Sequence, residues 1–358
     1  MNALPQDLRT APAAGVTLAD LHDPDEIARI ERFVAEQRGS VFHRPAWLAA
    51  IERGTGQQAL GLIATRAGRL TGWLPLSDVH SPLFGRALVS SGFAVGGGPL
   101  AVAEDESQAL CRAAEELALR RGANTIELRG GQAPQDWTAT STAHCNFARD
   151  LAADDEAELL AIPRKARAEV RKGLRNELAI AIGSDAEDRT AHYAVYSESV
   201  RNLGTPVFPR ALFDAVLDTF GADADILTVR HRGEPVASVL SLYHQGAVMP
   251  FWGGGRYVAR DLRANEAMYY ELMRHARARG CTRFDFGRSK TGSGPYFFKK
   301  NWGFDPEPLT YSSWTAAGVA PRNIDPTDEG YSRGIALWKR LPLPLANFIG
   351  PFIARGLG

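Results

Sequence analysis

The chain contains the same succession of glycines, helix and strand twice. In each half, three consecutive glycines precede a helix-like segment, a single glycine and a short apolar segment typical of a strand. These parts occupy 96–98, 106–121, 122 and 124–129 in the first half, and 253–255, 263–279, 280 and 282–287 in the second. The triple glycines lie 157 residues apart, far more than the roughly 20–50 residues of a solenoid unit. We therefore expect a duplicated domain, with the functional site in a groove between its copies.

Each half also contains a hairpin ahead of its glycines. The paired segments are 58–66 with 69–77 around Gly68, and 225–232 with 235–243 around Gly233. Three antiparallel strands followed by a helix and a further strand predict an α/β fold.

We expect the first domain to span 1–150, the second 151–318, and a C-terminal arm 319–358. Two domains agree with the length of 358 residues, which exceeds the size at which one core stops growing. A strand at 142–151 is expected to lead into the second domain, and a strand at 307–315 to close it.

Composition excludes several classes of function. Lysine plus arginine equals aspartate plus glutamate at 41 each, so total charge indicates neither a nucleic-acid nor a membrane protein. Cys111, Cys145 and Cys281 form no CxxC pair, which argues against a disulfide framework and a cysteine-rich zinc site. The histidines form no HxxxH or HExxH pair, so we expect no metal. No signal peptide and no run of 18 apolar residues is recognisable, and we expect a cytoplasmic protein.

Several segments of the second half resemble a known family. They are Gly253–Gly255, Ala267–Leu272, Ala278–Gly280, Phe284–Gly287 and Phe298–Phe304. Together they look like the second domain of the FemABX peptidyltransferases, which are built from two acetyltransferase-like (GNAT) domains and attach amino acids from aminoacyl-tRNA to cell-wall precursors. Arg201–Pro206 and Trp338–Pro342 are similar to FemAB-related proteins of PEP-CTERM/exosortase systems. The resemblance covers 150–315 well, and the first domain only by architecture.

The resemblance implies two tandem GNAT-like domains and an enzyme that moves an aminoacyl or acyl group onto an amine. The acceptor would be a cell-envelope precursor, in exopolysaccharide/PEP-CTERM or peptidoglycan biosynthesis. Aminoacyl-tRNA or acyl-CoA would be the co-substrate, with no tightly bound cofactor. Two alternatives stay open: an acyl-CoA-dependent GNAT N-acyltransferase, and a non-catalytic scaffold of an exopolysaccharide export system.

Two residues are candidates for catalysis. Lys299 follows Phe298 at the position where the family has a lysine proposed to stabilise tRNA phosphate or developing negative charge. Asp285 lies between two phenylalanines on a strand, so it faces away from both and is suited to orient an amine or accept its proton. The alternatives are a solvated Lys299–Lys300 pair and an ion pair of Asp285 with a neighbouring arginine.

Further residues are candidates for binding substrate. They are Arg201, Trp252, Arg288, Tyr296 and Phe298. The two aromatics Trp252 and Tyr296 could stack on a base or sugar, although a core position is the default for Trp252.

One basic face is a candidate phosphate site. Arg164, Arg167, Arg171 and Arg175 recur at spacings of three and four, so they share one side of a helix. Such a stripe can hold phosphates of tRNA or of a nucleotide-linked precursor. The alternative is a solvated face balancing the acids between 154 and 158.

The segment that should hold the pyrophosphate of acyl-CoA departs from the GNAT pattern. Arg263 stands where the first glycine of the phosphate loop is expected, in the segment Arg260–Asn265. Glycine lets backbone N–H groups approach a phosphate, so this departure disfavours acetyl-CoA.

The arm is basic and apolar. Residues 331–358 carry Arg333, Lys339, Arg340 and Arg355 and no acid. We expect the arm to pack across the protein's own domains. The functional alternative is a peripheral contact with anionic lipid, or with membrane-bound biosynthetic proteins at the inner face of the membrane.

Overall fold

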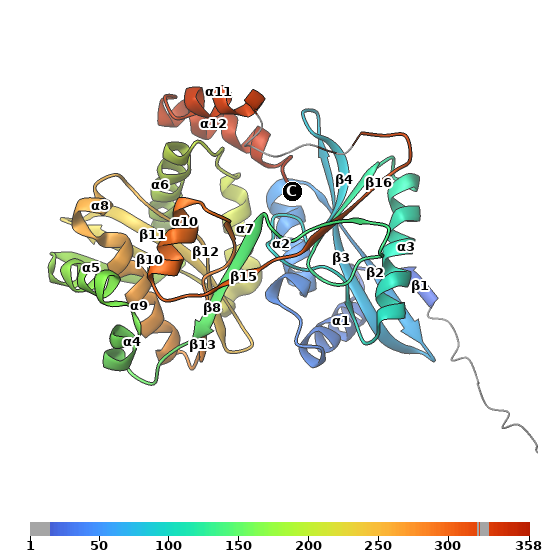
Figure 1. Cartoon of the computed structure of the whole chain (residues 1–358), viewed down its shortest axis with the longest axis horizontal. Helices are drawn as coiled ribbons and strands as arrows, with labels where there is room; N and C mark the ends of the chain where they lie inside the picture. The colour runs from blue at the N-terminus through green and yellow to red at the C-terminus, as the bar shows by residue number, and fades with distance from the viewer. Residues whose placement is uncertain (1–14, 321, 323–328) are drawn as a thin grey trace, which may run out of the picture.

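A computed structural model describes residues 15–320, 322 and 329–358. The structure contains two eight-stranded mixed sheets with helices packed on them (Figure 1). The helices are α1 Pro24–Glu36, α2 Pro45–Thr55, α3 Glu104–Arg120, α4 Asp155–Ala161, α5 Arg164–Arg175, α6 Ala186–Leu203, α7 Arg210–Phe220, α8 Ala259–Leu262, α9 Ala264–Ala278, α10 Gly294–Asn301, α11 Glu329–Trp338 and α12 Leu343–Ala354, with 3₁₀ turns η1 Val41–His43 and η2 Gly221–Asp223.

The strands fall into the two sheets as two sets. The first sheet holds β1 Gly15–Leu18, β2 Gln58–Arg66, β3 Arg69–Ser81, β4 Gly85–Ser90, β5 Leu100–Ala101, β6 Thr125–Arg129, β7 Thr138–Thr140 and β16 Tyr311–Thr315. The second holds β8 His144–Asp150, β9 Leu178–Gly183, β10 Ala224–His231, β11 Glu234–His244, β12 Ala247–Gly255, β13 Arg283–Asp285, β14 Ser289–Lys290 and β15 Pro306–Pro308.

The duplication predicted from the sequence is confirmed. The first sheet has the order β1-β2-β3-β4-β6-β16, and the second repeats it as β9-β10-β11-β12-β13-β8. In each sheet one pair is parallel, β4 with β6 and β12 with β13, because a helix crosses between those strands. The two hairpin turns also match: Ala67–Gly68 and Arg232–Gly233 all have positive φ, as tight type I′ turns require.

The two copies exchange strands across the expected boundary at residues 150 and 151. Strand β8 precedes the second copy and pairs antiparallel with β13, while β16 follows the second copy and pairs antiparallel with β6 of the first. Figure 1 shows β8 and β15 in the centre, where the two halves meet. Each sheet is therefore completed by a strand from outside its own half of the chain.

The triple glycines are not equivalent, contrary to the sequence alignment. In the second copy Gly253–Gly255 belong to β12 and pair with β11. In the first copy β4 ends at Ser90, and the pairing with β3 resumes only at β5. By register, Gly255 corresponds to Ala101, so the two glycine runs are three residues out of step. The glycines Gly96–Gly98 lie in a loop, 91–99, that interrupts the strand in the first copy only.

A hydrophobic cluster joins the two domains. Trp47 and Phe42 of the first domain meet Phe213, Phe251 and Trp252 of the second, with ring centroids of Trp47 and Phe251 at 5.3 Å. Separate clusters lie between each sheet and its crossing helix, α3 or α9. Because the interface is a continuous apolar core, the two domains form one packed body.

The arm packs across both domains, as expected. Ala346, Gly350 and Ala354 are the buried face of α12, and a Cβ at Gly350 would lie 3.0 Å from the backbone nitrogen of Val207. The chain then reaches the first domain, where Gln57 donates to the carbonyl of Arg355 at 2.8 Å. The side chain of Arg333 lies outside the described residues.

Candidate functional site

A cavity of about 260 Å³ lies where the two domains meet. It is lined by Arg38, Gly39, Ser40 and Val41 of the first domain and by Leu242, His244, Gln245, Ala247, Met249, Arg283 and Asp285 of the second. The cavity lies between the two copies, where the sequence analysis predicts the functional site. A larger depression of about 750 Å³ on α3 is lined by ion-paired groups at the outer edge of the first domain, and contains no predicted site residue (Figure 1).

Asp285 faces this cavity because successive side chains of a strand point to opposite faces of the sheet. Phe284 and Phe286 point into the core under α9, so the carboxylate between them points to the opposite face. It accepts the N–H of Gly287 at 2.9 Å and a hydrogen bond from Asn146. Burial raises the pKa of Asp285, although these hydrogen bonds and nearby Arg283 and Lys299 oppose the rise. The raised pKa makes the carboxylate a stronger proton acceptor than an exposed aspartate.

Lys299, on α10, contacts the turn 286–288 that follows Asp285. Its ammonium donates to the carbonyls of Gly287 at 2.9 Å and Arg288 at 3.0 Å, and it lies near the rings of Phe147 and Phe286. Burial lowers its pKa to about 7, against the opposing effect of Asp285. Lys299 is 8% exposed, so it is not the solvated lysine of the alternative interpretation. Its neighbour Lys300 is exposed.

Arg288 connects the turn to the first domain. Its guanidinium donates to the hydroxyl of Tyr311 at 3.1 Å, and that hydroxyl donates to the carbonyl of Val95 at 2.9 Å. The turn that contains Asp285, Arg288 and the carbonyls bound by Lys299 is thereby held from both domains.

The other predicted substrate-binding residues are dispersed. Tyr296 and Phe298 are half-buried on α10, packed against Phe147 and Phe286 respectively. Trp252 is 5% exposed and packs inside the interdomain cluster, so it has the core position that the sequence analysis favours over substrate binding. Arg201 donates to the carbonyl of Lys339 at 3.2 Å and so contacts the arm.

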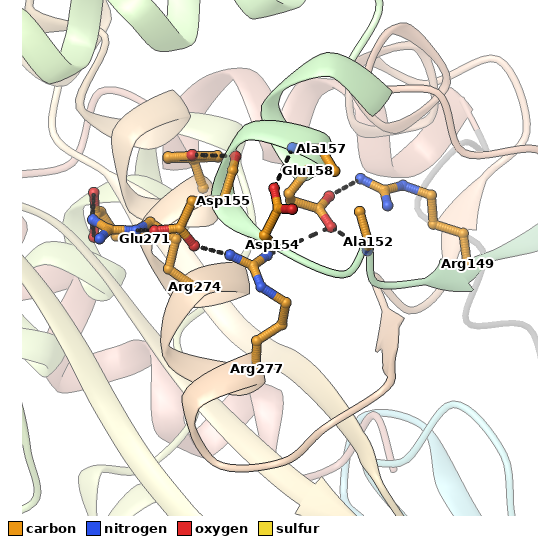
Figure 2. A network of polar contacts seen from close by, with 10 residues as sticks. Arg149, Ala152, Asp154, Asp155, Ala157, Glu158, Glu271, Arg274 and Arg277 are labelled. Atoms are coloured by element: carbon orange, nitrogen blue, oxygen red, sulfur yellow. Dashed lines mark hydrogen bonds and ion pairs between the residues drawn. The ribbon is translucent and has the colours of Figure 1, made fainter.

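Two acids of the segment 154–158, Asp155 and Glu158, form ion pairs away from the basic stripe. Figure 2 shows Glu158 accepting from the N–H of Ala152 at 2.7 Å and pairing with Arg149. Asp155 pairs with Arg274 at 2.7 Å and with Arg277 of α9. This network fastens the exchanged strand β8 to α4 and α9.

Asp155 and Glu158 are therefore not ion-paired with the stripe on α5. Arg164, Arg171 and Arg175 are exposed, and no ion pair of theirs occurs among the described residues. Arg167 is half-buried and donates to the carbonyl of Leu160 at 3.2 Å. The one acid of α5, Glu169, pairs with Arg263. The exposure of Arg164, Arg171 and Arg175 agrees with a solvated face, and phosphate binding by the stripe stays a prediction.

Arg263 adopts a left-handed turn directly before α9, at the position where the sequence analysis expects a glycine. It has φ +55°, the left-handed conformation that glycine adopts without strain, directly before α9. Its side chain pairs with Glu169 and donates to the carbonyl of Arg260. Helix α5 packs on this turn, and a Cβ at Gly173 would lie 2.6 Å from the Arg263 carbonyl oxygen.

Sequence reasoning missed the cavity residues outside the motifs. Arg38, His244 and Arg283 line the cavity, and burial lowers the pKa of His244, whose Nε2 contacts the carbonyl of Gly39 at 3.0 Å. The one available signal was positional, because Arg283 lies two residues before Asp285 on the same strand face. Across residues 15–320, 322 and 329–358, no group of three or more His, Cys, Asp or Glu side chains is arranged to hold a metal ion.

The comparisons with known proteins agree with this architecture. Residues 163–300 match the family described as acetyltransferase (GNAT) domain, and no curated protein matches the sequence significantly. The fold is that of tandem GNAT proteins.

Three solved structures illustrate the likeness. A crystal structure of FemX has a TM-score of 0.62 at 16% identity, over 80% of this chain and 95% of that one. The C-terminal domain of a putative lysylphosphatidylglycerol synthetase from Agrobacterium fabrum has a TM-score of 0.55 at 14% identity, over 82% and 93%. A tandem GNAT protein from the clavulanic acid biosynthesis pathway has a TM-score of 0.54 at 12% identity, over 86% and 100%.

Proposed function

We propose that the protein is a transferase that moves an aminoacyl or acyl group onto an amine of a cell-envelope precursor. The observation that carries the proposal is the position of Asp285, whose carboxylate lies in a cavity between the domains with its pKa raised. FemX and lysylphosphatidylglycerol synthetase, by their names, support an envelope acceptor and an aminoacyl donor.

In this proposal the acceptor amine lies in the cavity against Asp285. The amine attacks the carbonyl carbon of the donor ester, a C–N bond forms, and the amine proton passes to the carboxylate. The tetrahedral intermediate then collapses, the C–O bond breaks, and the leaving oxygen takes up the proton that Asp285 accepted, which restores the carboxylate. Lys299 places a positive charge beside the segment 285–288 and donates to the carbonyls of Gly287 and Arg288, while the N–H of Gly287 bonds the Asp285 carboxylate.

Aminoacyl-tRNA is the donor that the electrostatics favour. The unbalanced arginines of α5 offer a long cationic face to a phosphate backbone. For acyl-CoA, the loop before α9 would have to accept a pyrophosphate at Arg263, whose side chain is already paired. We place the acceptor in exopolysaccharide/PEP-CTERM or peptidoglycan biosynthesis, and the protein in the cytoplasm.

The direct test is transfer of labelled amino acid from aminoacyl-tRNA to two acceptors, a UDP-linked muropeptide and an amine-bearing polysaccharide precursor. We expect a new amide product with one of them. Absence of transfer from every aminoacyl-tRNA, with transfer from acetyl-CoA, would make the protein an acyl-CoA-dependent enzyme instead.

Binding of acetyl-CoA is an independent measurement. Because the glycine is replaced and Glu169 binds Arg263, we expect calorimetry to detect no binding tighter than about a millimolar Kd. A sub-micromolar Kd for acetyl-CoA would contradict the preference for aminoacyl-tRNA over acyl-CoA as the donor. If neither donor reacts and neither binds, the non-catalytic scaffold replaces both proposals.

A further inference from the structure

The outer face of α12 is apolar and has no cover among the described residues. Leu345, Phe348 and Phe352 lie within one side of the helix at spacings of three and four, and are 43%, 70% and 59% exposed. The rings of Phe348 and Phe352 contact each other at 6.1 Å. Single exposed apolar residues are ordinary, but three large ones on one face mark an interaction surface.

The helix is a fixed platform. Its opposite face is the small-residue row that packs near Val207, and Asn347 donates to the hydroxyl of Ser197 on α6 at 3.2 Å. Arg201 of α6 holds the end of α11 through the carbonyl of Lys339. Figure 1 shows α11 and α12 along the upper edge of the molecule, above α6. The apolar side chains therefore protrude from a supported helix.

The charged side chains of the segment that contains α12, 334–358, have one sign. Lys339, Arg340 and Arg355 are exposed, and the segment 334–358 contains no acid. Arg355 lies over the ring of Phe352 at 5.7 Å, so cation and apolar surface are adjacent. Protruding aromatic and aliphatic side chains bordered by cations suit the boundary between lipid headgroups and acyl chains.

We propose that the outer face of α12 docks the protein on an anionic lipid surface. Phe348 and Phe352 would enter the acyl boundary, while Arg340 and Arg355 meet the lipid phosphates. No helix within the described residues is both long and apolar enough to cross a membrane. The proposed contact is peripheral and independent of the transfer reaction.

Co-sedimentation with vesicles tests the proposal. We expect the full chain to bind phosphatidylcholine vesicles containing phosphatidylglycerol much more tightly than pure phosphatidylcholine, and binding to weaken as salt is raised. Phe348→Ser combined with Phe352→Ser should reduce the binding constant roughly tenfold or more. Arg340→Gln combined with Arg355→Gln should remove most of the preference for the anionic lipid.

The matched control is Leu119→Ser, because Leu119 is 57% exposed on α3, away from the arm. It should leave vesicle binding unchanged. Thermal melts establish that every variant is folded. Absence of vesicle binding by the unmodified protein overturns the proposal, as does equal binding by the folded double phenylalanine variant.

Discussion

The two copies share a topology but differ where their parallel strands separate. By the offset of the post-helix glycines, Asp285 on β13 corresponds to Glu127 on β6, and each faces away from its crossing helix. Glu127 is paired with Arg322 at 3.1 Å, whereas Asp285 faces the interdomain cavity. Both copies therefore have an acidic residue at this position, and only the acid of the second copy faces a cavity.

The rest of the first copy is closed in the same way. Arg129 is buried and donates to the carbonyl of Ala94 and to the backbone oxygen of Gly358, both at 2.7 Å. Loop 91–99 packs on that strand so closely that a Cβ at Gly98 would lie 1.8 Å from the carbonyl oxygen of Gly130. In the second copy β12 continues without such a loop. We infer that the first copy supports the site and the second performs the chemistry.

The largest expected effect separates the two acids. Asp285→Asn should lower the single-turnover rate roughly a hundredfold or more, because the amide cannot accept the amine proton. It should leave the melting temperature nearly unchanged or raised, since a buried charge is removed. Glu127→Gln is the control in the first copy, and it should keep the rate within about threefold of the unmodified protein. Equal losses from both variants would contradict the division of labour.

The next effect concerns Lys299. By the same offset of 158 residues it corresponds to Ser141 of the first copy, which is not basic. Lys299→Met should lower turnover roughly a hundredfold, if its charge acts mainly in the transition state. Lys300→Met should change the rate little, because Lys300 is exposed. Thermal melts accompany both rates. Loss of folding in Lys299→Met would show that the lysine has a structural role, through its hydrogen bonds to the Gly287 and Arg288 carbonyls.

The pH dependence of Lys299 gives a second measure. Because its folded pKa is about 7 and its ordinary value is 10.5, folding disfavours the protonated form. The free energy of unfolding should therefore fall as pH drops from about 10.5 toward 7. If transfer needs the ammonium, the rate falls as pH rises through about 7. A rate that keeps rising above pH 8 would exclude that requirement.

The smallest effect concerns donor binding by α5, which precedes β9; the corresponding position in the first copy precedes β1 and lies outside the described residues. Arg171→Gln combined with Arg175→Gln should weaken donor tRNA about tenfold and reduce the slope of log affinity against log salt by about one per arginine that contacts a phosphate. Arg120→Gln, an exposed arginine on α3, is the matched control. An unchanged salt slope in the folded double variant would remove α5 from the donor site.

The sequence by itself determined the duplicated architecture and the facing of single residues. Repeated glycines, hairpins and helices are local signals, and strand alternation placed Asp285 opposite its two phenylalanines because the side-chain period of a strand is fixed at two. Likewise the spacing on α5 placed its arginines on one face.

Tertiary structure alone decided which of these residues meet. The exchange of β8 and β16 and the three-residue shift between the glycine runs depend on backbone pairing between segments far apart in the chain. The ion-pair partners of Asp155, Glu158, Glu127 and Arg263 follow from packing, because an ion pair needs proximity in space. For the same reason the sequence could not distinguish the neutralised acid of the first copy from the open one of the second.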